Sequence, residues 1–193
     1  GTFLHYVLEH VIWEAADRGG FAQLADRELE RLLDRVIQQY MDAAMPGFES
    51  RDARFKYLFR RLRKTVGVIV ENVAEELKSS DFVPLEFELG FGDSGKLPAI
   101  TLHVPEASLT VAGKVDRVDG WLKDGKLYLR VVDYKSGKKA FDLSDVRHGL
   151  NIQMLLYLFA LEREGKRLFG REIVPAGIMY LPARDVLVSQ PRS

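Results

Sequence analysis

The chain contains no cysteine among its 193 residues, so disulfide bonds, thiolate zinc sites and cysteine nucleophiles are excluded. It also has no apolar run approaching the roughly 20 residues that span a bilayer, and no signal peptide is recognisable at its start. Neither sign of charge dominates, because 28 Lys and Arg residues balance 28 Asp and Glu residues. These features are compatible with a cytosolic protein without a membrane partner, in which a local patch must meet any anionic ligand.

The length and the 47% hydrophobic composition suffice for one sizeable core and are short for two. We therefore expect a single domain over residues 1–193. The chain opens at Gly1 without a methionine and enters a helical pattern at once. We expect it to be a fragment of a longer polypeptide.

Apolar residues recur at helical spacing through the first eighty residues. The first helix is expected from Leu4 to Ala15, with its end at the Arg-Gly-Gly of residues 18–20. A second helix is expected over about 26–45 and a third over about 51–77. Residues 1–80 are therefore predicted to form a helical section.

From Phe82 the hydrophobic period changes to two, which predicts strands. Residues 82–92 and 97–104 each read as a strand, and residues 109–137 read as a hairpin that turns at Asp124-Gly125. A helix over 143–165, closed by Gly165, and a last strand over 171–182 follow. This order predicts an α/β fold, with residues 81–193 forming a mixed β-sheet flanked by helices.

The register of the predicted hairpin follows from its turn. If Asp124-Gly125 is a two-residue loop, the pairing places Asp116 directly opposite Asp133. Alternation puts both acids on one face together with Lys135, and that face is apolar toward the turn, where it carries Leu122. Directly opposed like charges repel, by about 3 kcal/mol at an effective dielectric near 20. We therefore expect a cation to offset the two carboxylates.

A divalent ion would do so, because Mg²⁺ and Mn²⁺ take carboxylate oxygens and leave sites open for water and phosphate oxygens. Asp116 and Asp133 would supply about half of the ligands around such an ion. Lys135 could position or deprotonate a water and stabilise charge that develops on a phosphate. The constellation is that of metal-assisted phosphodiester hydrolysis.

Ordinary solvated ion pairs are the alternative. Asp116 could pair with Arg117 or Lys114, and Asp133 with Lys135 or Lys138. This interpretation would be favoured for an isolated Asp-x-Lys. It explains less well why four charges gather on the otherwise apolar face of a hairpin.

Several stretches together carry a resemblance to a known family. The chain resembles the nuclease domain of the RecB-like branch of the PD-(D/E)XK superfamily, and within it the B subunits of AddAB-type helicase-nucleases. The resemblance spans nearly the whole chain and implies a restriction-endonuclease-like core with an N-terminal helical section. It rests on the following motifs: GTFLHYVLE (1–9), FELGFG (87–92), GKVDRVD (113–119), VVDYKSG (131–137), QMLLY (153–157) and GIMYLPARD (177–185).

The resemblance implies a role for each residue at the end of the hairpin. Asp116 matches the first metal-binding acid of the family, Asp133 the second acid and Lys135 the catalytic lysine. The backbone carbonyl of Tyr134 is expected to ligate the metal as well. Mg²⁺ or Mn²⁺ is the implied cofactor.

The resemblance also implies roles outside the hairpin. Gln153 and Tyr157 match a helical pair near the active site that contacts DNA or the lysine, and His5 matches an additional metal ligand. Glu88 matches a family acid on the preceding strand and is a weaker candidate. Tyr157 could instead be a core aromatic, and His5 could pair with Glu9 one turn away. If the Gln153 amide were buried in this apolar helix without a function, its burial would cost free energy of folding.

Residues 51–64 carry seven basic residues against one acid, interleaved with aromatic side chains. A helix here is expected to turn Leu58 and Leu62 inward. The outward residues would be Arg54, Arg60, Arg61 and Lys64. Such a face could track DNA phosphates, and a merely solvated face remains an equal alternative.

The chain departs from the family in one respect. AddAB-type B subunits usually hold an iron-sulfur cluster through cysteines, and none is present here. Either the fragment ends inside those cysteines or its branch lacks the cluster. We favour the first interpretation.

The sequence therefore predicts a Mg²⁺-dependent, exonuclease-type deoxyribonuclease domain from the bacterial cytoplasm. It would cut a single DNA strand delivered by a helicase partner subunit during double-strand break repair and recombination. Two alternatives stay open. One is a non-catalytic module that keeps the nuclease fold to bind DNA or a partner, and the other is a plain structural domain.

Overall fold

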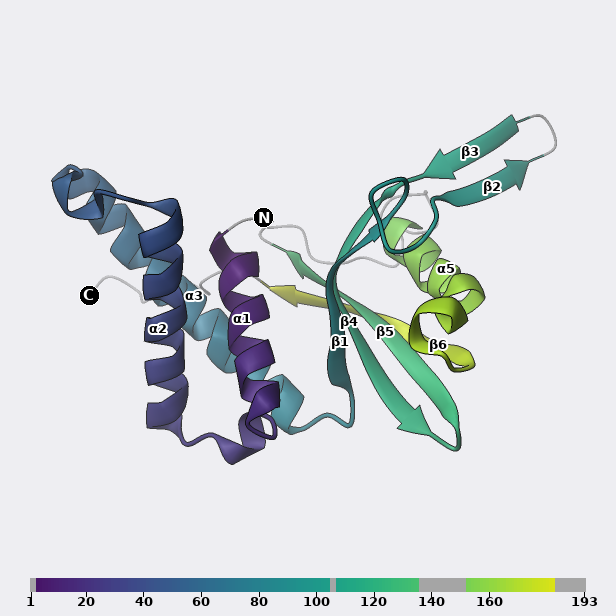
Figure 1. Cartoon of the computed structure of the whole chain (residues 1–193), viewed down its shortest axis with the longest axis horizontal. Helices are drawn as coiled ribbons and strands as arrows, with labels where there is room; N and C mark the ends of the chain where they lie inside the picture. Colours follow the sequence, from purple (N-terminus) through teal and green to yellow (C-terminus); the bar gives the residue numbers. More distant parts are fainter. Residues whose placement is uncertain (1–2, 105–106, 136–151, 183–193) are drawn as a thin grey trace, which may run out of the picture. The chain divides into compact units, whose positions relative to one another are not determined.

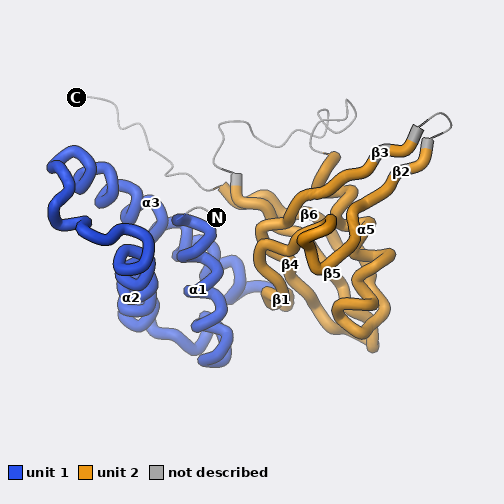
Figure 2. The backbone as a smooth tube through the Cα atoms, turned by 45° about the horizontal axis from the view of Figure 1, so that its top comes forward, with its two compact units in different colours: residues 1–80, 183–193 blue, residues 81–182 orange. Residues whose placement is uncertain are grey.

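The computed structural model describes residues 3–104, 107–135 and 152–182. By internal contacts the chain divides into two compact units, one of residues 1–80 with 183–193 and the other of residues 81–182 (Figure 2). The boundary falls between the predicted helical section and the predicted sheet. A single domain over the whole chain stays a prediction.

The described part of the first unit contains three helices, as predicted. They are α1 (Phe3–Asp17), α2 (Asp26–Ala44) and α3 (Ala53–Lys78), joined by 3₁₀ turns at Phe21–Gln23 and Phe48–Ser50. Each helix buries an apolar stripe, because its buried residues recur every three to four positions. The ring of Phe3 in α1 contacts Tyr40 of α2 and Phe59 of α3, with centroids 4.9 and 5.4 Å away. Aromatic contacts thus join all three helices.

Local signals set the helix ends. The predicted stop after α1 is observed, since the N–H of Gly20 donates to the carbonyl of Ala15 at 2.8 Å and Gly19 adopts a positive φ of 87°. Asp52 caps α3 by accepting a hydrogen bond from the N–H of Phe55 at 2.6 Å. Among the described residues, no helix is long and apolar enough to cross a membrane.

The second unit is built on a four-stranded mixed sheet, as predicted. Its strands are β1 (Val83–Phe91), β4 (Gly113–Lys123), β5 (Lys126–Lys135) and β6 (Ile173–Pro182), in the order β1-β4-β5-β6. The first two pairings are antiparallel, and β5 pairs with β6 in parallel. A parallel pair needs a crossover, and α5 (Ile152–Phe169) supplies it (Figure 1).

The core of this unit lies between α5 and one face of the sheet. Val118 of β4 with Leu129 and Val131 of β5 packs into one buried cluster with Leu158 and Leu161 of α5. Leu122, which the alternation places on this face, is 53% exposed, whereas Leu127 opposite it is buried in the same cluster. The apolar core therefore reaches the turn end of the hairpin on β5 and not on β4.

The predicted hairpin over residues 109–137 is longer than the observed one. Its first part belongs to β3 (Ala107–Val111), which pairs with β2 (Ile100–Val104) in a separate two-stranded sheet. Figure 1 shows this second hairpin extending away from the four-stranded sheet. The chain changes partners at Ala112, directly before Gly113.

The predicted end of the last helix was wrong. α5 runs past Gly165 to Phe169, and Gly170 closes it with a φ of 68° and an N–H that donates to the carbonyl of Lys166 at 2.9 Å. Gly165 serves packing instead, because a Cβ there would lie 3.1 Å from the side chain of Ile173 in β6. The predicted start of this helix, over residues 143–151, lies outside the described residues.

Candidate active site

The register predicted for the β4–β5 hairpin is confirmed. Asp124 and Gly125 both have positive φ, of 51° and 79°, as a two-residue type I′ turn requires. The observed pairs run from Lys123 with Lys126 back to Arg117 with Val132. They end one position short of Asp116 and Asp133, so both acids lie where the two strands begin to separate.

Asp116 lies against the strand that carries the second acid. Its Oδ2 atom accepts a hydrogen bond of 2.8 Å from the backbone N–H of Tyr134. Asp133, the residue before Tyr134, pairs across the sheet with Tyr180 of β6. Both acids are half-buried. The carboxylate of Asp116 thus contacts the backbone of the residue that follows Asp133.

Glu88 joins Asp116 from the other side. The observed pairs of Phe87 with Arg117 and Leu89 with Val115 leave Glu88 and Asp116 opposite each other between β1 and β4. A carboxylate oxygen of Glu88 and one of Asp116 lie within 4.8 Å of each other. Glu88, which the sequence indicated only as a weaker candidate for the site, therefore lies beside Asp116, a predicted metal ligand.

The backbone of Glu88 is unusual. Its φ is +50°, a region that residues other than glycine enter at a cost of about 1–3 kcal/mol. Such strained residues cluster where function requires a particular side-chain direction. Here the left-handed conformation occurs within β1, at the residue that faces Asp116.

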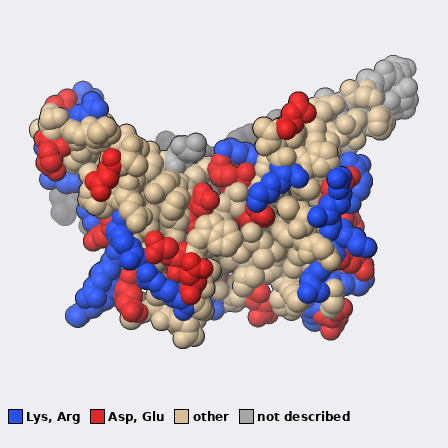
Figure 3. All heavy atoms as spheres, in the orientation of Figure 1, with Lys and Arg blue, Asp and Glu red and all other residues tan. Residues whose placement is uncertain are grey.

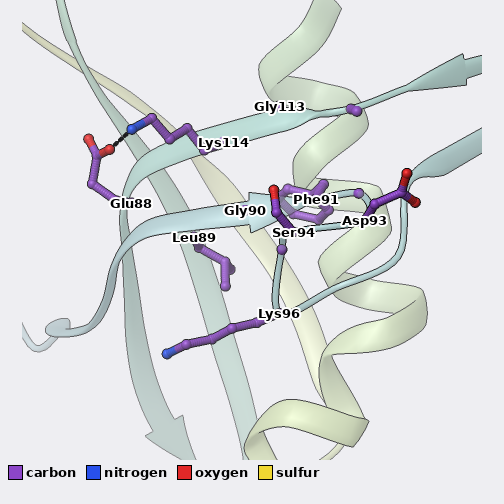
Figure 4. A pocket seen from close by; sticks show the side chains of 12 residues that line it. Glu88, Leu89, Gly90, Phe91, Asp93, Ser94, Lys96, Gly113 and Lys114 are labelled. Atoms are coloured by element: carbon purple, nitrogen blue, oxygen red, sulfur yellow. Dashed lines mark ion pairs between the residues drawn. The ribbon is translucent and has the colours of Figure 1, made fainter. Parts of the chain in front are cut away.

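The chemistry of this site follows from its charges. Two carboxylates within 4.8 Å of each other repel by about 3 kcal/mol at an effective dielectric near 20. Lys114, two residues before Asp116 on β4, offsets part of this through an ion pair with Glu88 (Figure 4). One Mg²⁺ or Mn²⁺ ion spans oxygens about 4 Å apart, so a small side-chain rotation lets both carboxylates bind it. The donor set fits a hard divalent cation.

Tyr134 contributes its backbone to this region and buries its side chain on the opposite face. Its hydroxyl accepts a hydrogen bond of 3.0 Å from Arg117. Burial raises the pKa of the Tyr134 hydroxyl to about 12, and the nearby Arg117 charge opposes that rise. The phenol therefore stays neutral, and the predicted role of its carbonyl as a metal ligand stays a prediction.

Arg117 lies in a buried group of opposite charges. Arg117 and Asp119 are both fully buried, with Nε of the arginine 2.7 Å from Oδ1 of the aspartate. Arg130 of β5 donates from Nε to Oδ2 of the same aspartate at 2.8 Å. Sequence reasoning missed this group, although the alternation of Arg117 and Asp119 within "DRVD" places them together on the face away from α5.

Gln153 and Tyr157 meet as predicted for one turn of helix. Gln153 donates from Nε2 to the hydroxyl of Tyr157 at 2.5 Å. Tyr157 is buried and stacks on Phe91, with ring centroids 4.8 Å apart. Its hydroxyl reaches the start of β4, where a Cβ on Gly113 would overlap that oxygen. The pair thus joins α5 to the strand that carries Asp116.

The cost of a buried amide, which favoured a functional role for Gln153, does not arise in the structure. Gln153 is exposed, so its amide does not interrupt a buried surface. Ile152 beside it is 43% exposed as well, because the first turn of α5 lies beyond the edge of the core. The alternative that Tyr157 is a core aromatic with its hydroxyl at the rim agrees with its burial.

The roles of all the predicted site residues stay predictions, and for two of them the described part of the chain gives the position alone. Lys135 is the last residue of β5, where its backbone pairs with Pro182, and its side chain lies outside the described residues. His5 lies half-buried on α1 in the first unit. Their catalytic and metal-binding roles stay predictions.

The basic segment forms the first half of α3, and its outward residues are exposed as predicted. Leu58 and Leu62 were wrongly placed inward, since they are 51% and 42% exposed. The inward stripe runs through Phe59 and Val66 instead. Figure 3 shows basic and acidic side chains intermingled over one face of the molecule, in keeping with the balanced composition.

Comparison of the sequence with known proteins identifies a family that it matches. The family model of the PD-(D/E)XK nuclease superfamily matches residues 1–192. The chain is 32% identical to the B subunit of an ATP-dependent helicase/deoxyribonuclease from Clostridium novyi, with the whole chain covered. It is 34% identical to the B subunits of the same name from Moorella thermoacetica and Caldanaerobacter subterraneus, over 98% and 97% of the chain. The chain spans only 16–17% of the length of these relatives.

Proposed function

Because the chain belongs to the PD-(D/E)XK nuclease superfamily, we propose that it is a metal-dependent deoxyribonuclease domain that hydrolyses phosphodiester bonds. The observation that carries the proposal is the pair of carboxylates from Glu88 and Asp116, within 4.8 Å of each other. Asp116 lies at the open end of the hairpin whose second strand, β5, carries Asp133 and Lys135, and Glu88 faces it from β1. A divalent cation is well suited to stabilise like charges gathered at a strand end.

Asp116, Asp133 and Glu88 would hold the ion, with the Tyr134 carbonyl and His5 as further ligands. When bound, Mg²⁺ or Mn²⁺ supplies Lewis-acid stabilisation of charge on the phosphate. Lys135 orients the attacking water and stabilises the negative charge that develops on the phosphate oxygens. Gln153 and Tyr157 position the start of β4 through the contact of the tyrosine hydroxyl with Gly113.

The context of the reaction is proposed from the relatives. They are named as B subunits of a helicase/deoxyribonuclease, which implies a partner subunit and a DNA substrate. We propose that a helicase delivers one strand to this domain in the bacterial cytoplasm, during double-strand break repair and recombination. The products would be exonucleolytic fragments with 5′-phosphate ends. An iron-sulfur cluster has no cysteine ligands in this sequence.

A cleavage assay tests the proposal. The purified chain is incubated with end-labelled single-stranded DNA in Mg²⁺ or Mn²⁺, with a chelator in a parallel reaction. Lys135→Ala is expected to slow cleavage by about 100- to 1,000-fold, the usual effect of removing one electrostatic group from such a site. Lys123→Ala, at the turn end of the same hairpin, is the matched control and keeps wild-type rates.

Three results separate the alternatives. Cleavage that survives the chelator or the loss of Lys135 contradicts the proposed mechanism. DNA binding without metal and without cleavage supports the non-catalytic module. Absence of metal binding in calorimetry, together with absence of DNA binding, contradicts both and leaves a structural domain.

A further inference from the structure

Lys114 holds an unusual position between the acids and an open pocket. It is the second residue of β4, it lies two positions before Asp116, and its ammonium pairs with the carboxylate of Glu88. Its side chain is 52% exposed, whereas that of Glu88 is 24% exposed. A half-exposed cation therefore neutralises one of the carboxylates that the proposed metal would need.

The pocket beside this ion pair has a volume of about 730 Å³. Its lining comes from the end of β1, the loop after it and the start of β4, and includes four glycines, namely Gly90, Gly92, Gly95 and Gly113. Figure 4 shows Glu88 and Lys114 at one end of this pocket and Asp93 at the other.

Close backbone packing explains why glycines line this pocket. A Cβ on Gly95 would overlap the carbonyl oxygen of Gly90, and one on Gly113 would overlap the Tyr157 hydroxyl. At both places the neighbouring atoms leave no room for a side chain. These two glycines therefore serve close packing within the protein.

We propose that Lys114 alternates between two anions: it neutralises Glu88 in the metal-free protein, and it binds a phosphate of the DNA strand once a divalent ion occupies Glu88. The pocket then holds the nucleotide next to the one being cut. This inference rests on the proposed function, because it requires both the metal and the DNA strand.

Electrostatics favour the exchange. A doubly charged ion bound directly to the Glu88 oxygens interacts with them more strongly than a half-exposed ammonium does, and it repels that ammonium. The released lysine has a flexible four-carbon stem and three donors, which suit a phosphate approached from several directions. Lys96, the other lysine of the pocket, is already 2.6 Å from a carboxylate oxygen of Glu86. Lys114 is therefore the cation that metal binding makes available.

The spacing along β4 supports the assignment. Two residues of a strand cover about 7 Å, so Lys114 and Asp116 lie about one nucleotide apart along an extended chain. A phosphate bound by Lys114 would neighbour the phosphate at the metal. Asp93 lies at the far end of the pocket and does not oppose this contact (Figure 4).

The test uses Lys114→Met, which keeps the apolar stem and removes the charge, with Lys96→Met as the matched control and Lys114→Arg as the conservative variant. Without DNA, calorimetry with Mn²⁺ is expected to show about fivefold tighter binding to Lys114→Met, because a half-exposed ion pair no longer competes with the ion. The Lys96→Met variant is expected to bind Mn²⁺ as the wild type does.

A second measurement follows DNA affinity in a Lys135→Ala background, so that cleavage does not interfere. With Mn²⁺, Lys114→Met is expected to weaken single-strand binding and to lower the salt slope by about 0.7, and Lys114→Arg is expected to restore both. Without metal, Lys114→Met leaves DNA affinity unchanged.

The inference is overturned if wild type binds Mn²⁺ and Lys114→Met changes neither metal nor DNA affinity, and the proposed function then still stands. If wild type does not bind Mn²⁺ at all, the proposed function fails and this inference fails with it. Thermal melting of each variant confirms that it folds.

Discussion

Strand β4 contributes to two groups of charged side chains that differ in burial and in the signs of the charges they bring together. The arginine cluster, formed by Arg117, Asp119 and Arg130, is buried and joined by contacts of 2.7–2.9 Å between opposite charges. The acid cluster, formed by Glu88 and Asp116, is half-buried and brings like charges within 4.8 Å of each other. Four consecutive residues, Asp116–Asp119, supply members of both, because alternate side chains point to opposite faces.

This contrast indicates that the arginine cluster stabilises the fold and that the acid cluster is the candidate functional site. In the arginine cluster both arginines pair with the buried Asp119, and Tyr134 accepts a further hydrogen bond from Arg117, so opposite charges join the group internally. The acid cluster brings two carboxylates together, with Lys114 paired to Glu88, and its oxygens suit a divalent cation. Charge complementarity marks the structural group, and the approach of like charges marks the candidate site.

Removal of Asp119 is expected to have the largest effect on stability. Asp119→Ala leaves Arg117 and Arg130 close together in a buried environment without their anion, which typically costs 3–5 kcal/mol. Urea unfolding followed by circular dichroism measures the loss. Asp81→Ala, an exposed aspartate of the same unit, is the control and is expected to change stability by less than about 0.5 kcal/mol. A loss below about 1 kcal/mol for Asp119→Ala would contradict the structural role of the cluster.

Tyr134 is expected to make stability depend on pH in the alkaline range. The pKa of its hydroxyl is about 12 in the folded protein and about 10 in the unfolded chain, so above pH 10 the unfolded state releases a proton that the folded state keeps. The associated stability is complete below pH 10 and is lost as pH rises through 12, to a total of about 3 kcal/mol. Comparison of wild type with Tyr134→Phe isolates this contribution. Equal pH dependence of the two proteins would show that the phenol is not held neutral.

Asp116→Asn is expected to have the smallest effect on stability. Unlike the two changes above, it is expected to stabilise the protein or leave its stability unchanged. Asparagine keeps an oxygen that can accept the hydrogen bond from the Tyr134 N–H and removes one of two like charges. Without metal, the free energy of unfolding is expected to stay equal or to rise by up to about 1 kcal/mol. With Mn²⁺, wild type gains melting temperature and the variant does not, because a ligand that binds only the folded state stabilises it. A large destabilisation without metal would assign Asp116 to the structural group.

Local signals predicted much of this fold. The Asp124-Gly125 turn determines the hairpin register by itself, because a two-residue loop with two positive φ angles permits one pairing. The three helices of the first unit follow from apolar spacing and end signals. Gly165 and the pair Leu58 and Leu62 were misread because a glycine can serve packing and a leucine can lie outside the buried stripe.

The sequence by itself determined the family, the division into a helical section and a sheet, and the presence of Asp116, Asp133 and Lys135 at the end of one hairpin. Only the tertiary structure placed Glu88 beside Asp116, paired Lys114 with Glu88 and joined Arg117 and Arg130 through Asp119. The reason is the range of the interactions. A hairpin register depends on a few adjacent residues, whereas the partner of β1 and the pairing of buried charges depend on how distant segments pack together.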